Sequence, residues 1–374
     1  MSGLRKRVYD SWLGQQFRTS RLGVATLEGV AGILRLLPVP KHIFDPENDT
    51  WRKFHYFDHG RMSLPVSLDL EFESLLANNI ELSDRVARLR ERCPRVGMVF
   101  SSGRAGTRGF SLFLDSKDGL TALHRPGDVA GFEHSGVDVD PGLRNTVVYG
   151  LMMGPRDETW WRQHAEHVVS MLEFAASLDT KEFWLTAHRW NCYFPMIELV
   201  LARRCPAILL DRTSEKIIHS MISRNQYCPA TAIADQESTW VNIEPQLAET
   251  LEGGAGHLRM TTAPLFDRVC WYVSFVRYWF DVCTKENRCT DLHAVLDIDD
   301  LAAHSVDSYQ LIDRVVGLAE KSPEHLLDHF RVPKNVKPRS TQTGLRFPAI
   351  ERWTAAMNDR KQAIAARWNS TGPI

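Results

Sequence analysis

A glycine-rich segment early in the chain has residues that suit anion binding. The apolar run at residues 96–101 is followed by SGRAGTRG and then by FSLFLD, which predicts a strand, a glycine loop and a helix. Glycines let backbone N–H groups turn inward, and a helix N-terminus adds partial positive charge. Such a loop suits a phosphate or sulfate group, although an ordinary strand-to-helix turn has a similar composition.

Two common nucleotide-binding motifs do not fit this loop. A Walker A loop needs a lysine directly before its hydroxyl residue. Here Gly106 is followed directly by Thr107, and the basic residue is Arg104. The loop also lacks the G-x-G-x-x-G spacing of a dinucleotide fingerprint. An anion site of another kind is therefore predicted.

The order of basic residue, any residue, glycine and threonine after a strand resembles the 5′-phosphosulfate loop of sulfotransferases. These enzymes use 3′-phosphoadenosine-5′-phosphosulfate (PAPS) as donor. Golgi-type and bacterial members often carry Ser-Gly-Arg-x-Gly-Thr, which SGRAGT matches. The resemblance implies that Arg104 and Thr107 contact the 5′-phosphosulfate. It also implies a cradle around that group, formed by Ser102, Gly103, Arg104, Ala105, Gly106, Thr107 and Arg108.

A second part of the resemblance lies further along the chain. The family binds the 3′-phosphate of the donor with an arginine at a strand end and a serine about eight residues later. Here AILLDR ends at Arg212, and Ser220 follows eight residues on. Arginine offers a planar fork to a phosphate, and serine adds a short hydrogen bond. Each residue alone could equally be an ordinary residue of a helix or its flank.

A candidate general base lies between these two parts. FWLTAHR predicts a strand followed by His188, where cytosolic sulfotransferases have a strand ending in Lys-Thr-His. Histidine titrates near neutrality, and open α/β sheets bind ligands at strand ends. Golgi-type enzymes often use a glutamate base, so Glu133 is a rival candidate. A structural, hydrogen-bonded role for His188 stays open.

One residue departs from the family pattern. The lysine two positions before the histidine, which helps the leaving group, is replaced by Thr186. Its role must then pass to Arg104, Arg189 or another residue.

The C-terminal region resembles the family more weakly. The segment HAVLDIDDL at residues 293–301 resembles a strand and acidic turn and is interpreted as structural. The basic segment at 337–346 resembles the loop that closes over the nucleotide. Its candidate ligands for the 3′-phosphate are Arg339, Ser340 and Arg346. A solvated basic loop is the alternative for each of them.

Predicted strands and helices alternate along most of the chain. Strands are expected at residues 96–101, 146–152, 183–187, 207–210 and 293–298. Helices are expected at 70–92, 157–178, 196–204, 214–224, 262–285, 305–320 and near Trp353. This alternation predicts an α/β fold with three layers, in which helices cover both faces of a central parallel sheet. The resemblance implies a P-loop NTPase-like sulfotransferase domain at 96–374, after a mostly helical accessory segment at 1–95.

Charge and cysteine content limit the expected partners. The chain of 374 residues has 45 Lys and Arg against 46 Asp and Glu, so no general attraction to nucleic acid is expected. Seven scattered cysteines indicate reduced thiols and a cytoplasmic location. Charged residues interrupt the apolar stretches, which argues against a membrane span. No metal-site spacing is recognised, so no metal is expected. Homo-oligomerisation stays open.

These patterns predict a sulfotransferase that moves the sulfuryl group of PAPS to a hydroxyl or amine of a small-molecule acceptor. The product nucleotide is 3′-phosphoadenosine-5′-phosphate (PAP). Acceptor contacts are expected from residues 120–144 and 225–261. Two alternatives stay open. A nucleotide-dependent kinase on a P-loop fold is disfavoured by the missing Walker lysine, and a catalytically silent sulfotransferase-like binding protein is favoured by Thr186.

Overall fold

A parallel sheet forms the centre of the molecule. The computed structural model describes residues 39–53, 64–124, 147–148, 150–151, 156–223, 263–285, 292–303, 305–317 and 347–369. Within them, five strands pair in the spatial order β2-β3-β1-β4-β5, and every pair is parallel. The strands are β1 (Arg95–Phe100), β2 (Leu120–Leu123), β3 (Glu182–Leu185), β4 (Ala207–Asp211) and β5 (His293–Asp297). This order differs from the 3-2-1-4-5-6 and 2-1-3-4-5 orders of two common doubly wound folds.

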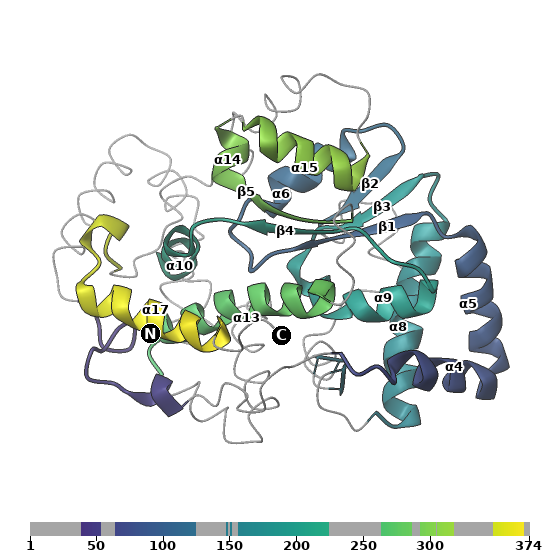
Figure 1. Cartoon of the computed structure of the whole chain (residues 1–374), viewed down its shortest axis with the longest axis horizontal. Helices are drawn as coiled ribbons and strands as arrows, with labels where there is room; N and C mark the ends of the chain where they lie inside the picture. The colour runs from purple at the N-terminus through teal and green to yellow at the C-terminus, as the bar shows by residue number, and fades with distance from the viewer. Residues whose placement is uncertain are drawn as a thin grey trace, which may run out of the picture.

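Helices cover both faces of the sheet (Figure 1). On one face, Val99, Trp184 and Ile208 join a core formed with α6 (Thr107–Asp115), α14 (Ile298–Ala302) and α15 (Val306–Val316). On the other face, Met98 and Phe183 join the larger core. That core includes residues of α8 (Glu158–Ala176), α9 (Phe194–Leu201), α10 (Ser214–Ser223) and α13 (Leu265–Lys285). The predicted α/β class and central parallel sheet are confirmed.

The order in which successive strands are added to the sheet reverses after β1. The connection from β1 to β2 runs one way with α6 on one face, and the other connections run the opposite way with their helices on the other face. A common hand for all crossovers requires this combination. The connections that leave β1 and β4, which are neighbours, therefore lie on opposite faces. The carboxyl ends of the strands β1 and β4 therefore form a topological switch point, where open α/β sheets bind ligands.

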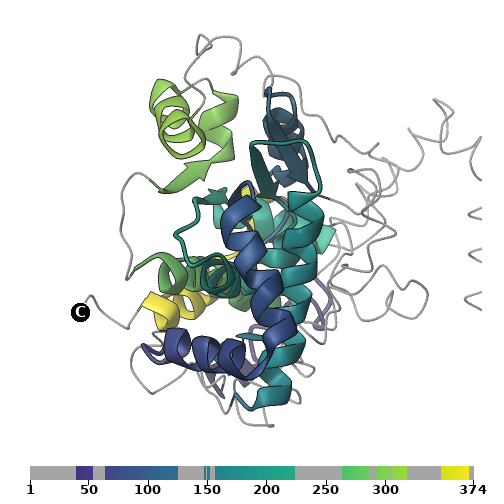
Figure 2. The same ribbon diagram turned by 90° about the vertical axis from the view of Figure 1, so that its right-hand side faces the viewer.

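The N-terminal helices share the larger core with the sheet. The helices α4 (Leu68–Asn78) and α5 (Ile80–Arg92) bury Phe72 and Val86 in it, and α5 lies beside α8 (Figure 2). A bidentate ion pair between Arg85 and Glu173 joins α5 to α8, at 2.7 and 2.8 Å. These helices confirm the helical prediction for residues 70–92. The proposed domain boundary at residue 95 stays a prediction.

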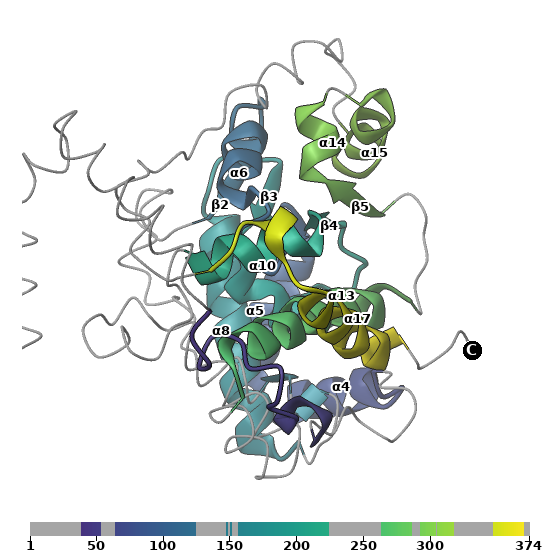
Figure 3. The same ribbon diagram turned by 90° about the vertical axis from the view of Figure 1, so that its left-hand side faces the viewer.

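The C-terminal helix α17 (Ala355–Asn369) lies beside α13 (Figure 3). Before it comes the short helix η7 (Ile350–Arg352), and Trp353 packs edge-on against Phe266 of α13 at 5.4 Å between ring centroids. Nη1 of Arg360 on α17 donates a hydrogen bond to the buried Asp267 side chain of α13, at 2.8 Å. Among the described residues, no helix combines the length and apolar character needed to cross a membrane.

One predicted strand is wrong and one strand of the sheet was not predicted. The strand expected at residues 146–152 is helical at 147–148 and 150–151, where Val147, Val148 and Leu151 are buried at the spacing of one helix face. A run rich in β-branched residues had favoured a strand there, and tertiary packing overrides that local preference. The strand β2 was missed, because Thr121 interrupts the apolar residues of Leu120–Leu123 and the segment shows no clear alternation. It lies inside a segment that was expected to contact the acceptor.

Candidate functional site

The glycine loop joins β1 to α6 at the switch point with unusual backbone geometry. Gly103, Arg104 and Gly106 have φ values of 84°, 62° and 80°. A β-carbon on Gly106 would lie 2.8 Å from Cγ1 of Ile298, so the loop approaches the start of α14 closely. The left-handed backbone of Arg104 is costly for a residue with a side chain. Strained residues of this kind persist only where the surrounding structure holds them in place, and they are frequent at ligand sites.

The N-terminus of α6 lacks a side-chain cap. Its N-cap residue is Gly106, which has no side chain that could accept a hydrogen bond from the first turn of the helix. A helix N-terminus of this kind can bind an anion with its N–H groups. The N–H of Gly103, in contrast, donates to the Ser101 hydroxyl at 2.9 Å. The backbone N–H of Gly103 is therefore already used within the loop, and the start of α6 at Gly106 is the better candidate for binding an anion.

Arg104 and Ser220 are in direct contact. Nε of Arg104 donates a hydrogen bond to Oγ of Ser220 on α10, at 3.1 Å. The resemblance implied opposite ends of the donor for these residues, with Arg104 at the 5′-phosphosulfate and Ser220 at the 3′-phosphate. The contact shows that the glycine loop and α10 are neighbours in the fold. Ser102, Ala105 and Thr107 are buried in that loop, while Arg104 and Arg108 are half-buried.

Arg212 is held by an aspartate that the sequence interpretation treated as structural. Nε of Arg212 lies 3.2 and 3.3 Å from the two carboxylate oxygens of Asp299 on α14. Lys216, in the first turn of α10, donates to the same carboxylate at 2.8 Å. Burial raises the pKa of Asp299, but the hydrogen bonds from Lys216 and Arg212 outweigh burial and hold that pKa below its usual value. Asp299 therefore carries its negative charge near neutral pH.

Arg277 of α13 fixes the turn that carries Arg212. Its Nη2 donates to the Asp211 carboxylate at 2.9 Å and to the Arg212 carbonyl at 3.0 Å, and its Nη1 donates to the Ser214 hydroxyl at 2.8 Å. These bonds span the end of β4 and the start of α10. The backbone of Arg212 is thus fixed from one face of the sheet and its side chain from the other.

The segment with His188 lies against the glycine loop. His188 begins the short helix η4 (His188–Tyr193), which follows β3. In η4, Nδ2 of Asn191 donates to the Ser101 carbonyl at 3.1 Å, and Trp279 of α13 donates to the Asn191 carbonyl at 3.0 Å. The backbone of His188 is therefore near the loop. The side chains of His188 and Arg189 lie outside the described part of the structure.

Thr186 is buried and hydrogen-bonded within the sheet. Its side chain is fully buried, and its hydroxyl donates to the Leu123 carbonyl at 3.1 Å, which helps to hold β3 beside β2. It therefore does not substitute for the family lysine.

Several candidate residues lie outside the described residues: Glu133, Arg339, Ser340 and Arg346. Most of the expected acceptor segments lie there too. Sequence interpretation missed Lys216, Asn191, Arg277 and Asp299. The available signals were weak: a lysine four residues after Arg212, and an acidic pair after the last strand.

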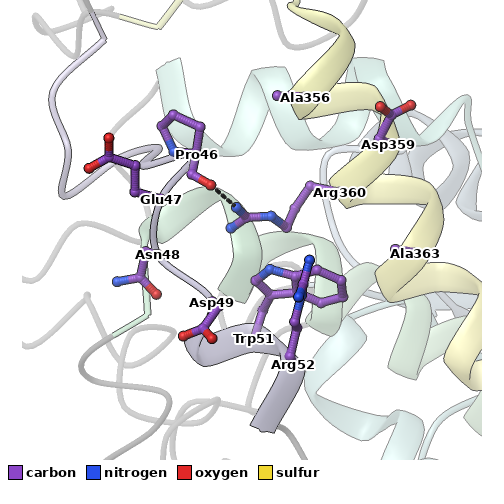
Figure 4. A pocket seen from close by; sticks show the side chains of 10 residues that line it. All are labelled: Pro46, Glu47, Asn48, Asp49, Trp51, Arg52, Ala356, Asp359, Arg360 and Ala363. Atoms are coloured by element: carbon purple, nitrogen blue, oxygen red, sulfur yellow. Dashed lines mark hydrogen bonds between the residues drawn. The ribbon is translucent and has the colours of Figure 1, made fainter.

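A separate pocket of about 440 Å³ lies between residues 46–52 and α17 (Figure 4). None of the predicted site residues lines it. The Arg360 guanidinium at its wall donates to the Pro46 carbonyl at 3.0 Å and lies 5.2 Å from the centroid of the Trp51 ring. This cation is thus engaged within the protein, and we assign no ligand to the pocket.

Comparison of the chain with protein-family models, curated proteins and solved structures found no significant match. A functional assignment therefore rests on the residues and their arrangement.

Proposed function

We propose that this protein is a PAPS-dependent sulfotransferase that acts on a hydroxyl or amine of a small-molecule acceptor. The observation that carries the proposal is the contact between Arg104 and Ser220, at 3.1 Å. It brings the SGRAGT loop and the Arg–Ser segment to one place at the carboxyl ends of β1 and β4. The proposal includes a P-loop-like sulfotransferase fold for residues 96–374.

The residues at the switch point suit a donor with two anionic ends. The uncapped N-terminus of α6 and Arg104 provide hydrogen-bond donors for the 5′-phosphosulfate. Arg212 provides a planar, permanently charged group for the 3′-phosphate. Ser220, on the helix that follows Arg212, accepts a hydrogen bond from Arg104 and so links the two sets. The donor chemistry therefore fits the groups that the fold brings together.

The donor supplies an activated sulfuryl group whose transfer forms an acceptor–sulfur bond and breaks the bond from sulfur to the bridging phosphate oxygen. His188 or Glu133 accepts the proton that the acceptor loses. Arg104 and the loop amides stabilise the charge that grows on the leaving phosphate. Like phosphoryl transfer, the reaction depends mainly on positioning and charge stabilisation.

A second candidate is a sulfotransferase-like protein that binds the nucleotide without transferring sulfate. The buried Thr186, bonded to the Leu123 carbonyl, favours it, because the position of the family lysine does not serve the leaving group here. An acceptor screen with labelled PAPS separates the candidates. Transfer to any acceptor supports the enzyme, and donor binding without transfer across a broad panel supports the silent protein.

Calorimetry with PAP and AMP tests the donor assignment directly. We expect PAP to bind and AMP, which lacks the 3′-phosphate, to bind more weakly. Absence of PAP binding, or equal binding of both nucleotides, would overturn the assignment. If the wild type transfers sulfate, His188→Ala should lower its turnover while PAP affinity stays near that of the wild type. Unchanged turnover would assign the base to Glu133 or to another residue.

A further inference from the structure

We propose that Asp299 is a positioning residue that aligns Arg212 and Lys216 as a two-cation anchor, and that this anchor selects nucleotides with a second phosphate. Lys216 is thereby assigned as a ligand of that phosphate beside Arg212. The inference rests on the proposed function and adds to it the residues that set donor selectivity. It assigns a functional role to the acidic turn after β5.

The contacts of Asp299 leave much of the Arg212 fork for an anion. Both carboxylate oxygens of Asp299 approach Nε of Arg212, at 3.2 and 3.3 Å. Within the described residues, this is the only side-chain contact of the Arg212 guanidinium. Its terminal N–H groups are the ones that bind a phosphate in a forked geometry. The Arg212 and Asp299 side chains are 32% and 34% exposed, so the anchor is accessible to a solute.

Asp299 is itself held in place. Its backbone N–H donates to the carboxylate of Asp297, the N-cap residue of α14, at 2.7 Å. The preceding residue, Ile298, is the one that a β-carbon on Gly106 would meet. Two consecutive residues of α14 thus reach both halves of the site, with Ile298 at the glycine loop and Asp299 at the cation pair. The position of the carboxylate is therefore linked to the position of the loop.

The three charged side chains of the anchor, Arg212, Lys216 and Asp299, carry more positive than negative charge. Arg277 is paired with Asp211 at 2.9 Å, so its charge is balanced within the turn. Arg212 and Lys216 share the single carboxylate of Asp299, at 3.2 and 2.8 Å. Taken by themselves, these two cations and one carboxylate carry a net charge of about +1, which attracts a phosphate dianion. The Asp297 carboxylate, which accepts a hydrogen bond from the Asp299 backbone N–H, adds an opposing charge in the same turn. AMP has no group to place there, so the anchor should act on PAP alone.

A positioning role and a pure charge effect of Asp299 predict opposite changes in PAP affinity for the variant Asp299→Asn. Loss of a negative charge beside a phosphate should tighten PAP binding if charge alone matters. Loss of alignment should weaken it, because the side chains of Arg212 and Lys216 must then be ordered when the ligand binds. The direction of the change in PAP affinity therefore distinguishes the two roles.

The experiment measures the affinities of the full-length wild type and its variants for PAP and AMP by calorimetry. We expect Asp299→Asn and Lys216→Met each to lower the preference for PAP over AMP by about tenfold, the scale of a lost hydrogen bond to a charged group, while AMP affinity is unchanged. Asp300→Asn is the matched control: it makes the same charge change at the next, exposed position of α14 and should keep the wild-type preference.

Four results would overturn the inference. Tighter PAP binding by Asp299→Asn would leave Asp299 as an opposing charge only. An unchanged preference in both variants, with a wild type that prefers PAP, would remove the anchor while the proposed function stands. A wild type without preference for PAP would overturn both. Equal losses for PAP and AMP would indicate general damage to the site and would also contradict selective positioning.

Discussion

Arg104 and Ser220 are 116 residues apart in the chain, yet Nε of Arg104 donates a hydrogen bond to the Ser220 hydroxyl at 3.1 Å. Arg104 makes this contact from a left-handed backbone with φ of 62° in the loop after β1. Ser220 lies on α10, in the segment that follows β4. The bond therefore joins the two segments that leave the neighbouring strands of the switch point. A ligand held by one segment should be sensitive to the other.

The first prediction is energetic coupling between these two residues in PAP binding. In a double-mutant cycle of Arg104→Ala and Ser220→Ala, we expect a coupling energy of about 0.5–3 kcal/mol, the range for residues in contact. Calorimetry on the wild type, both single variants and the double variant measures it. Ser223→Ala is the control, since this hydroxyl on the same helix contacts His219 instead, at 3.3 Å. The effects of Ser223→Ala and Arg104→Ala on the free energy of PAP binding should be additive, with no coupling energy. Equal coupling for both serines would contradict the prediction.

The second prediction compares two glycines of the same strand-to-helix element. Gly106→Ala should lower the free energy of unfolding by about 1–3 kcal/mol, because φ of 80° is strained for alanine and the new methyl group meets Ile298. Gly109→Ala should raise it by about 0.5–1 kcal/mol, because Gly109 lies within α6 and its β-carbon would meet nothing within 4 Å. Urea unfolding of both variants measures the difference. If both substitutions changed the free energy of unfolding in the same direction, the described loop geometry would be wrong.

The third prediction concerns the position where the resemblance expects a lysine. Thr186→Lys should not restore a leaving-group role, because the side chain is buried and its hydroxyl donates to the Leu123 carbonyl. An uncompensated charge there should destabilise the fold by about 3 kcal/mol or more. Thr186→Val, which keeps the shape and removes the hydroxyl, should cost about 1 kcal/mol. Thermal unfolding and a transfer assay measure both effects. A stable lysine variant with faster transfer would show that this position faces the donor.

Burial explains which parts of the fold could be predicted from the sequence. The strands β1, β3, β4 and β5 were predictable because they are short runs of mostly apolar residues, of which Phe183 and Ile208 are fully buried. Such runs between turn residues are typical of parallel strands. In contrast, only two residues of β2, Ala122 and Leu123, are buried, so it has no continuous apolar run. The helical turn at Val147 was not predictable, because its β-branched residues locally favour a strand.

The site was predictable only where its chemistry is local in the chain. Arg104 and Ser220 each lie in a recognisable segment, and the structure brings them together. The partner of Arg212 is Asp299, which is 87 residues away on an element with no chemical signature of its own. A contact of that kind depends on how β4 and β5 pair and on where α14 begins. Neither composition nor spacing contains that information.

The last prediction is a pH-dependent stability that arises at the contact between α13 and α17. Asp267 is fully buried, 2.8 Å from Arg360. Burial raises the pKa of Asp267 from 3.8 to about 7, against the opposing effect of Arg360. Below pH 3.8, this carboxyl is protonated in both the folded and unfolded states. Between that pH and about 7, only the unfolded chain has lost the proton, so the free energy of unfolding should fall as pH rises.

One such proton changes the free energy of unfolding by at most about 1.4 kcal/mol per pH unit. Asp267→Asn should remove this contribution to the slope, although it also lowers stability because Arg360 loses its partner. Urea unfolding at a series of pH values between about 4 and 8 measures the slope. Asp359→Asn is the control, since Asp359 is exposed on α17 beside Arg360 and should keep the wild-type slope. If Asp267→Asn also kept that slope, the buried carboxyl would not be the titrating group, and the pH dependence would have to arise elsewhere.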